Sequence, residues 1–193
     1  QKISKDDAEK LLNAFHNSLK IIDSLFADKA FKRYYAGTDV NNSGYWENKK
    51  FNVSLYDALM FAFRDKDINM VMNTKDLIRE AIIGLMTSDE KFIESISRST
   101  SSKDMLQYRC EVVERLIKDV LNTTSKQPRC FTLEFKQYLF DNNPTCEICG
   151  NRIEHIDDAA VDHIEQYWQG GKTIPENARL THRYCNNARK RKE

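Results

Sequence analysis

The chain lacks an excess of charge of either sign. Its 193 residues carry 30 Lys and Arg against 29 Asp and Glu, a formal net charge of +1. This balance gives no overall electrostatic reason to bind nucleic acid or a membrane surface, so any basic surface must be local. The chain also lacks an apolar run of the roughly 20 residues that a membrane span requires. These absences predict a soluble protein and exclude one that is uniformly basic.

The first residues, QKISKDDAEK, lack the basic start and apolar run of a secretory signal, which favours an intracellular protein. The chain begins with Gln1 and not with methionine, so we expect a piece of a longer protein. The composition, 40% hydrophobic and 31% charged, is typical of a globular chain with one domain or two small ones.

Residues 5 to about 122 show the periodicity of helices separated by short breaks. Ser4 can cap the first turn of the first helix, because its side chain can accept a hydrogen bond from a backbone amide. Further starts, each followed by an acidic residue, are indicated at Ser54, Thr74, Ser88 and Ser102. Residues 38–50, TDVNNSGYWENKK, are rich in turn formers and indicate a loop. The pattern predicts about five helices.

A polar stretch with a proline, NTTSKQPRC at residues 122–130, indicates a domain boundary. We predict a helical domain over residues 1–124, acting as a scaffold or linker, and a second domain over residues 130–193. The second domain starts with one more helix, TLEFKQYLF. From Asp141 onwards the sequence has turn residues and scattered aromatics and no long apolar period.

Two pairs of metal-ligating residues share one spacing in this second domain. Cys146 and Cys149 form the motif CEIC, and His182 and Cys185 form HRYC. A gap of two residues lets both ligands of a pair point at one tetrahedral ion, and two pairs complete a closed zinc site, which is structural and not catalytic. His155 could replace His182 as a ligand. Free thiols or a redox pair are the alternative.

The residues between the two pairs predict a ββα unit. AAVDHIEQ is typical of a short strand, in which Val161 and His163 face one side and Asp162 the other. The elements that follow are a loop (169–177), a second strand (178–181) and a helix (182–192). In such a unit the end of the first strand approaches the first turns of the helix.

This approach would bring a carboxylate, a carboxamide oxygen and an imidazole together. Oxygen ligands suit a hard cation such as Mg²⁺ or Mn²⁺, and a neutral histidine can take a proton from water. The end of the chain adds a local basic patch that could lie along a phosphate backbone. This patch comprises Arg183, Arg189, Lys190, Arg191 and Lys192. Together these features favour cleavage of a phosphodiester bond.

The pattern C-x-x-C, V-D-H-I, G-G-x-T-x-x-x-N and H-x-x-C-N, over about residues 143–190, resembles the HNH (ββα-metal) endonuclease family. The resemblance implies that His163 is the general base and that Asp162 and Asn186 hold one Mg²⁺ or Mn²⁺ ion. It implies that Asn177 holds the histidine loop in place. Asn186 stands where the family name expects a third histidine, a variation that also occurs in active members. The expected fold is therefore mainly α: a helical region followed by a small zinc-stapled ββα-metal domain.

The helical region, in phrases such as KKFNVSLYDALMFAF, resembles the C-terminal segment of GmrSD-like modification-dependent restriction proteins. That resemblance implies a cytoplasmic bacterial protein in phage defence. Its missing N-terminal part would be a ParB-like nucleotide-handling domain, and this piece would cut phage or modified DNA. Three functions stay open: a DNA endonuclease, a non-catalytic zinc-containing module that binds nucleic acid, and a toxin-like nuclease acting on RNA.

Overall fold

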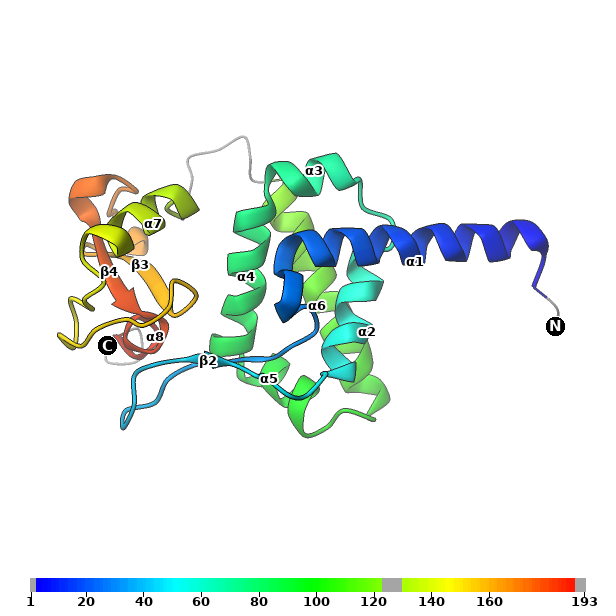
Figure 1. The fold of residues 1–193 in the computed structure, drawn as a ribbon, viewed down its shortest axis with the longest axis horizontal. Coiled ribbons are helices and arrows are strands. Elements are labelled where there is room, and N and C mark those ends of the chain that lie inside the picture. The colour runs from blue at the N-terminus through cyan, green and yellow to red at the C-terminus, as the bar shows by residue number, and fades with distance from the viewer. Residues whose placement is uncertain (1–2, 123–129, 190–193) are drawn as a thin grey trace. The chain divides into compact units, whose positions relative to one another are not determined.

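The computed structural model describes residues 3–122 and 130–189. Helices form most of the structure, and the described part of the chain also has two short two-stranded sheets (Figure 1). The chain divides into two compact units. The helical unit comprises residues 1–33 and 47–122, and the zinc-site unit comprises residues 34–46 and 123–193. The predicted fold class, mainly α with a small C-terminal ββα domain, is confirmed.

The helical unit contains six α-helices in its described residues, one more than the periodicity predicts. They are α1 (Lys5–Phe26), α2 (Val53–Phe63), α3 (Ile68–Asn73), α4 (Lys75–Ser88), α5 (Glu90–Ser97) and α6 (Lys103–Asn122), with a 3₁₀ turn at Ala27–Lys29. Fully buried side chains from several of these helices form its core, among them Ile21, Leu59, Ile82 and Phe92. The additional helix is α3, whose six residues are too few to show a period.

Several helix starts follow hydrogen-bonding side chains, but the predicted cap Thr74 makes no such bond at the start of α4. Ser4 accepts from the backbone amide of Asp7 at 3.1 Å, as predicted. The second helix begins one residue before the predicted Ser54, because Asn52 accepts from the amide of Leu55 at 2.9 Å. Asp89, not Ser88, caps α5 in the same way. Carboxylate and carboxamide oxygens are effective caps, so they displace a neighbouring serine.

The stretch predicted as a loop, residues 38–50, contains one strand of a hairpin. Strand β1 (Tyr34–Tyr35) pairs antiparallel with β2 (Tyr45–Trp46). The rings of Tyr35 and Tyr45 stack with their centroids 5.0 Å apart. This hairpin interrupts the helical unit in sequence but groups with the C-terminal residues. The zinc-site unit is thus built from two separate segments of the chain.

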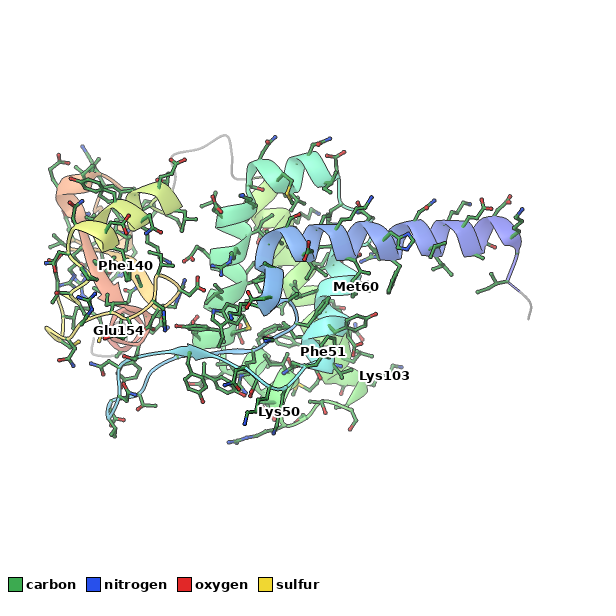
Figure 2. The ribbon with its side chains drawn as sticks, in the orientation of Figure 1. Lys50, Phe51, Met60, Lys103, Phe140 and Glu154 are labelled. Carbon is green, nitrogen blue, oxygen red and sulfur yellow. The ribbon has the colours of Figure 1, made fainter. Side chains whose placement is uncertain are left out.

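The zinc-site unit also contains α7 (Leu133–Asn142), β3 (Ala159–His163), β4 (Ala178–His182) and α8 (Arg183–Arg189). The antiparallel β3 and β4 place Asp162 opposite Arg179. Short 3₁₀ turns at Tyr167–Gln169 and Pro175–Asn177 lie in the loop between the two strands. A small core contains Cys146, Ile153, Ala159, Leu180 and Cys185, and Leu139 and Phe140 of α7 pack against it. Figure 2 labels Phe140 on α7. The predicted boundary near residue 124 lies outside the described residues, and the predicted domain limits stay predictions.

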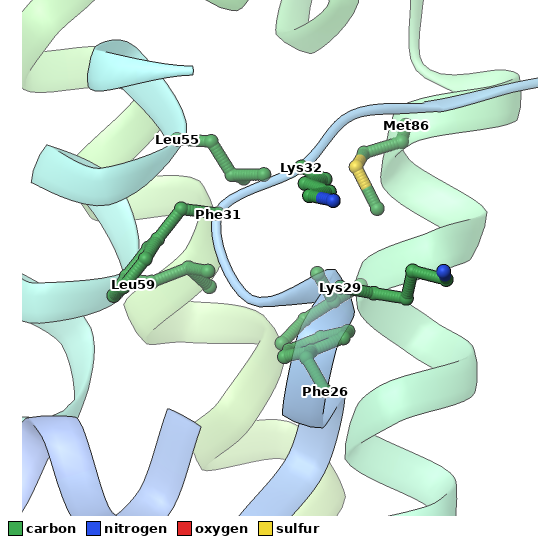
Figure 3. A pocket seen from close by; sticks show the side chains of 8 residues that line it. Phe26, Lys29, Phe31, Lys32, Leu55, Leu59 and Met86 are labelled. Atoms are coloured by element: carbon green, nitrogen blue, oxygen red, sulfur yellow. The ribbon is translucent and has the colours of Figure 1, made fainter. Parts of the chain in front are cut away.

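In the described part of the helical unit, an open hollow of about 860 Å³ is lined mostly by charged side chains, among them Asp65, Lys66 and Glu114. An apolar space lined by Phe26, Leu55, Leu59 and Met86 (Figure 3) is too narrow for a water molecule, so it is part of the packing. No helix among the described residues is long and apolar enough to cross a bilayer. Among the described residues, the group of side chains that could hold a metal ion lies in the zinc-site unit.

Candidate metal centre and catalytic site

The four predicted zinc ligands converge. The ligand atoms of Cys146, Cys149, His182 and Cys185 all lie within 4.8 Å of one another. Nδ1 of His182 is 3.4 Å from Sγ of Cys149 and 3.9 Å from Sγ of Cys185. Around a tetrahedral zinc, with bonds of about 2.0–2.3 Å, neighbouring ligand atoms lie about 3.5–3.8 Å apart. The group fits zinc, and His155, which is exposed, is not part of it.

The thiols of this group titrate unequally. Burial raises the pKa of Cys149, but hydrogen bonds from the Asn151 backbone and from the side chains of Asn42, Cys146 and Cys185 outweigh it and lower the pKa to about 7. Burial and the neighbouring sulfurs raise the pKa of Cys185. Crowded thiols in one pocket resist simultaneous ionisation, so a bound cation must displace protons.

The ring nitrogen of His182 that faces away from the sulfurs, Nε2, is held by a backbone carbonyl. Nε2 lies 3.2 Å from the carbonyl oxygen of Arg152 and 4.0 Å from Oδ2 of Asp158. A proton on Nε2 can be donated to that carbonyl, which leaves Nδ1 to face the sulfurs as the metal ligand. Asp158 is 1% exposed, and its Oδ2 has no hydrogen-bond partner among the described residues. Asp158 therefore supports the orientation of His182 through charge at short range.

The hairpin contacts the segment that carries Asp158. The hydroxyl of Tyr34 donates to Oδ1 of Asp158 at 3.2 Å, and Nε1 of Trp46 donates to Oδ2 of Asp157 at 2.8 Å. A Cβ at Gly44 would lie 2.8 Å from the same Oδ1, so glycine permits this close approach. Burial raises the pKa of Tyr34, which keeps its hydroxyl protonated as a donor. The sequence gives no signal for Asp158 or Tyr34, because they are distant along the chain.

Arg183, the first residue of α8, contacts the same segment of Asp157 and Asp158. It is 7% exposed; its backbone amide donates to the carbonyl of Asp158 at 2.8 Å, and Nε donates to the carbonyl of Asp157. The structure therefore buries this member of the predicted basic patch. Lys190, Arg191 and Lys192 lie outside the described residues, and the proposed DNA contacts of the patch stay predictions.

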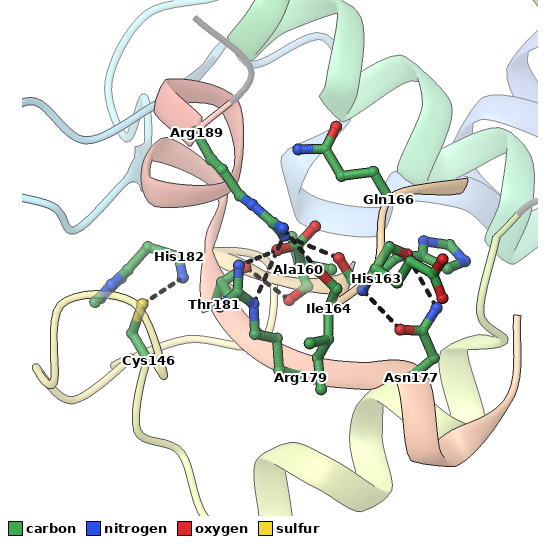
Figure 4. Close-up of polar contacts among 12 residues, drawn as sticks. Cys146, Ala160, His163, Ile164, Gln166, Asn177, Arg179, Thr181, His182 and Arg189 are labelled. Atoms are coloured by element: carbon green, nitrogen blue, oxygen red, sulfur yellow. Dashed lines mark hydrogen bonds and ion pairs between the residues drawn. The ribbon is translucent and has the colours of Figure 1, made fainter. Parts of the chain in front are cut away.

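Asp162, near the end of β3, is held by the guanidinium groups of Arg179 and Arg189, two side chains that Figure 4 labels. Its Oδ2 accepts from Nε and Nη2 of Arg179, at 2.9 and 2.7 Å, and from Nη1 of Arg189, at 2.6 Å. Val161 packs against the core, and Asp162 lies on the opposite side of β3. Asp162 is nevertheless only 8% exposed, because the two arginines cover its carboxylate. Within residues 3–122 and 130–189, no hydrogen bond or ion pair reaches Oδ1. The carboxylate thus keeps one oxygen for a further ligand.

His163, the last residue of β3, is fixed by its neighbours. Nε2 lies 2.9 Å from Oγ1 of Thr173, and the rings of Phe131 and Tyr167 have centroids 4.7 and 5.8 Å from the imidazole. When Nε2 carries the proton and donates it to Thr173, Nδ1 is the basic nitrogen. The imidazole is then oriented for proton transfer at Nδ1.

Asn177 fastens the loop between β3 and β4. Its Oδ1 accepts from the amide of Glu165 at 2.8 Å, and Nδ2 donates to the carbonyls of Glu165 and Lys172, at 3.0 and 2.9 Å. A Cβ at Gly171 would lie 1.9 Å from the Glu165 carbonyl oxygen, so only glycine lets the loop close in this way. The loop in turn carries Thr173, the partner of His163. Asn177 thus joins Glu165 and Lys172 within the loop, and its role in a catalytic site stays a prediction.

Asn186 lies on α8, one turn before Arg189, and is partly exposed. Residues three apart on a helix share a face, and Arg189 reaches Asp162, so Asn186 belongs to the part of α8 on the side of Asp162. Oδ1 of Asp162 and a carboxamide oxygen are ligands that suit Mg²⁺ or Mn²⁺. The donor set fits such an ion, although the two guanidiniums compete with it for the carboxylate.

A comparison with protein-family models matches residues 146–192 to the family described as HNH endonuclease. The matched segment contains the four cysteine and histidine ligands together with Asp162 and His163. Searches of curated proteins and of solved structures gave no match. The chain therefore has a C-terminal HNH domain, which covers less than half of its length.

Proposed function

We propose that the HNH domain is a divalent-metal-dependent endonuclease that hydrolyses phosphodiester bonds of DNA. The observation that carries the proposal is the pairing of Asp162 and His163 at the end of β3. One carboxylate oxygen is open, and the imidazole is fixed through Nε2. A module that only binds nucleic acid needs no carboxylate and imidazole at adjacent positions in this arrangement.

In the proposed reaction Nδ1 of His163 accepts a proton from water, and the water oxygen attacks the phosphorus in line with the 3′ oxygen. The bond from phosphorus to the 3′ oxygen breaks, and that oxygen leaves with the bonding electrons. A divalent ion held by Asp162 and Asn186 would supply positive charge for the phosphate and the leaving oxygen. Thr173 holds the imidazole ring through Nε2, and a proton on Nε2 leaves Nδ1 as the basic nitrogen.

Two further groups support this chemistry. Asn177 holds the loop that carries Thr173, so that the histidine keeps its orientation. Arg179 and Arg189 hold Asp162 by charge, and their guanidiniums can also attract the phosphate to the site. The zinc ligands stabilise the domain, because a closed four-ligand site leaves no coordination position for water.

The test is cleavage of supercoiled plasmid by the chain with Mg²⁺ or Mn²⁺. His163→Ala is compared with His155→Ala, which changes an exposed histidine outside the site. We expect the parent and His155→Ala to convert the plasmid to nicked DNA and His163→Ala to lose this activity. One such site cuts one strand, so linear DNA requires two copies or two events. Equal cleavage by all three proteins would reject His163 as the base.

The alternative function is a zinc-containing module that binds nucleic acid without cutting it. It predicts retention of DNA without added divalent metal and no cleavage by any variant. A nuclease acting on RNA predicts cleavage of an RNA substrate, lost in His163→Ala, with the plasmid intact.

We also propose that the chain is the effector part of a bacterial phage-defence protein acting on modified DNA, joined to a ParB-like domain. This part of the proposal rests on the helical sequence phrases alone. The test is cleavage of modified and unmodified phage DNA by the longer protein with nucleotide. Equal cleavage of both DNAs would contradict it.

A further inference from the structure

A row of aromatic rings leads away from His163 along α7. The ring centroids of His163 and Phe131 are 4.7 Å apart, those of Phe131 and Phe135 5.5 Å, and those of Phe135 and Tyr138 6.3 Å. The angle between neighbouring ring planes falls from 39° through 31° to 19°. We call Phe131, Phe135 and Tyr138 the aromatic row. Its outer rings are close to parallel.

The order of the row follows from the start of α7. Thr132 caps this helix, and its Oγ1 accepts from the amide of Phe135 at 3.2 Å. The cap fixes the direction of the chain at Phe131, which precedes it, and so sets Phe131 beside Phe135. Tyr138 follows Phe135 by three residues and shares its face of the helix. The row is therefore a fixed feature of the helix and its cap.

The hydrophobic core does not account for the outer end of the row. Leu139 and Phe140 are the residues of α7 that pack against the buried cluster, whereas Tyr138 is 62% exposed. Phe131 and Phe135 are partly buried. A single exposed tyrosine is ordinary. Here, however, Tyr138 is the outer end of a stack whose inner end lies beside the candidate general base His163. The exposed ring of Tyr138 therefore has a free aromatic face.

We propose that the aromatic row stacks on the bases of a few unpaired nucleotides next to the phosphate that is cut. The preferred substrate would then be DNA with a single-stranded segment. This proposal rests on the proposed function, because His163 fixes where that phosphate lies. Bases of any sequence stack on aromatic rings, so the row would select for unpaired nucleotides and not for sequence.

The charges near the row are mixed: positive at its inner end and negative beside Tyr138. At the inner end Arg179 and Arg189 supply positive charge for the phosphate. The acidic residues Glu134 and Asp141 lie four before and three after Tyr138 on α7. Both carboxylates share the helix face of Tyr138, so a strand whose bases stack on the rings must hold its phosphates away from them.

The test is binding of the whole chain to a labelled single-stranded oligonucleotide and to the same sequence as a duplex, followed by fluorescence anisotropy without added Mg²⁺ or Mn²⁺. The variants are Tyr138→Ala, Tyr138→Phe and Phe15→Ala, the last changing an exposed aromatic on α1. We expect Tyr138→Ala to weaken single-strand binding roughly tenfold. Tyr138→Phe and Phe15→Ala should bind like the parent, and duplex binding should not change.

A second readout separates stacking from general loss of structure. In an oligonucleotide containing 2-aminopurine, stacking on a ring quenches the fluorescence, so the parent and Tyr138→Phe should quench it and Tyr138→Ala should not. Equal single-strand affinity of Tyr138→Ala and Phe15→Ala, or equal losses on single strand and duplex, would overturn the proposal. Plasmid cleavage, measured separately, tests the nuclease function: nicking without the Tyr138 effect rejects only the aromatic row. The Tyr138 effect without any nicking rejects only the nuclease.

Discussion

Nη1 of Arg189 donates to Oδ2 of Asp162 at 2.6 Å and to the backbone carbonyl of His163 at 2.9 Å. Nη2 of the same guanidinium donates to the carbonyl of Ile164 at 2.7 Å. One side chain of α8 thus holds the end of β3 and also neutralises part of the charge that a divalent ion would use. Under the proposed nuclease function, these two effects would make opposite contributions to the cleavage rate.

Replacing Arg189 with alanine should therefore separate the two effects. Removal of one positive charge in contact with Asp162 should tighten Mn²⁺ binding by roughly tenfold, which corresponds to about 1.4 kcal/mol. Cleavage should fall nonetheless, because the end of β3 loses three hydrogen bonds. Mn²⁺ titration followed by electron paramagnetic resonance gives the affinity. Asp162→Asn serves as the reference that loses this site, and Arg152→Ala serves as the exposed control. Unchanged or weaker Mn²⁺ binding in Arg189→Ala would count against the competition.

A second prediction concerns Asn177. Replacement by alanine removes the contacts to Glu165 and Lys172, so Thr173 no longer fixes the imidazole. A small displacement of a catalytic group can reduce the rate by about 10²-fold, and we expect a loss of kcat of this order. The KM for DNA and the zinc content should change little. Asn143→Ala, at an exposed position after α7, is the matched control. Loss of zinc together with activity would instead indicate general unfolding of the domain.

The contact of Tyr34 with Asp158 leads to a third prediction. Tyr34→Phe removes the donor to a buried carboxylate oxygen, and such a loss costs about 1–3 kcal/mol. We expect a lower free energy of unfolding for the zinc-site unit and a faster release of zinc to a chelator. Tyr45→Phe, on the exposed side of the hairpin, should alter neither. Zinc release that is equal in the two variants would contradict the support of His182 through Asp158.

The zinc site could be predicted from the sequence because its pattern is local: each pair of ligands lies on one turn, and spacing alone indicates a shared ion. Short alternating and helical patterns also predict the two strands and α8, although β3 (Ala159–His163) ends before Gln166, the last residue of the pattern AAVDHIEQ. The hairpin and Asp158 could not be predicted, since 124 positions separate Tyr34 from its partner. No periodicity records such a contact, because it depends on how the segments pack. The arginines on Asp162 were missed for a related reason: their alignment requires the strand register.

The last prediction concerns pH and zinc. The ion binds thiolates, and the pKa of Cys149 is lowered to about 7 whereas burial raises that of Cys185. As the pH falls, protons compete with zinc at Cys185 throughout the neutral range and at Cys149 below about pH 7, so the affinity must fall with acidification. Between about pH 8 and about pH 6 the apparent zinc affinity should drop by at least roughly tenfold per pH unit, since one or more protons are displaced.

Competition with a chromophoric chelator measures this dependence of the zinc affinity on pH. Cys110→Ser, in α6 of the helical unit, should leave this dependence unchanged, and Cys149→Ser should weaken zinc binding at every pH. An affinity independent of pH would show that the ion is not held by these thiols.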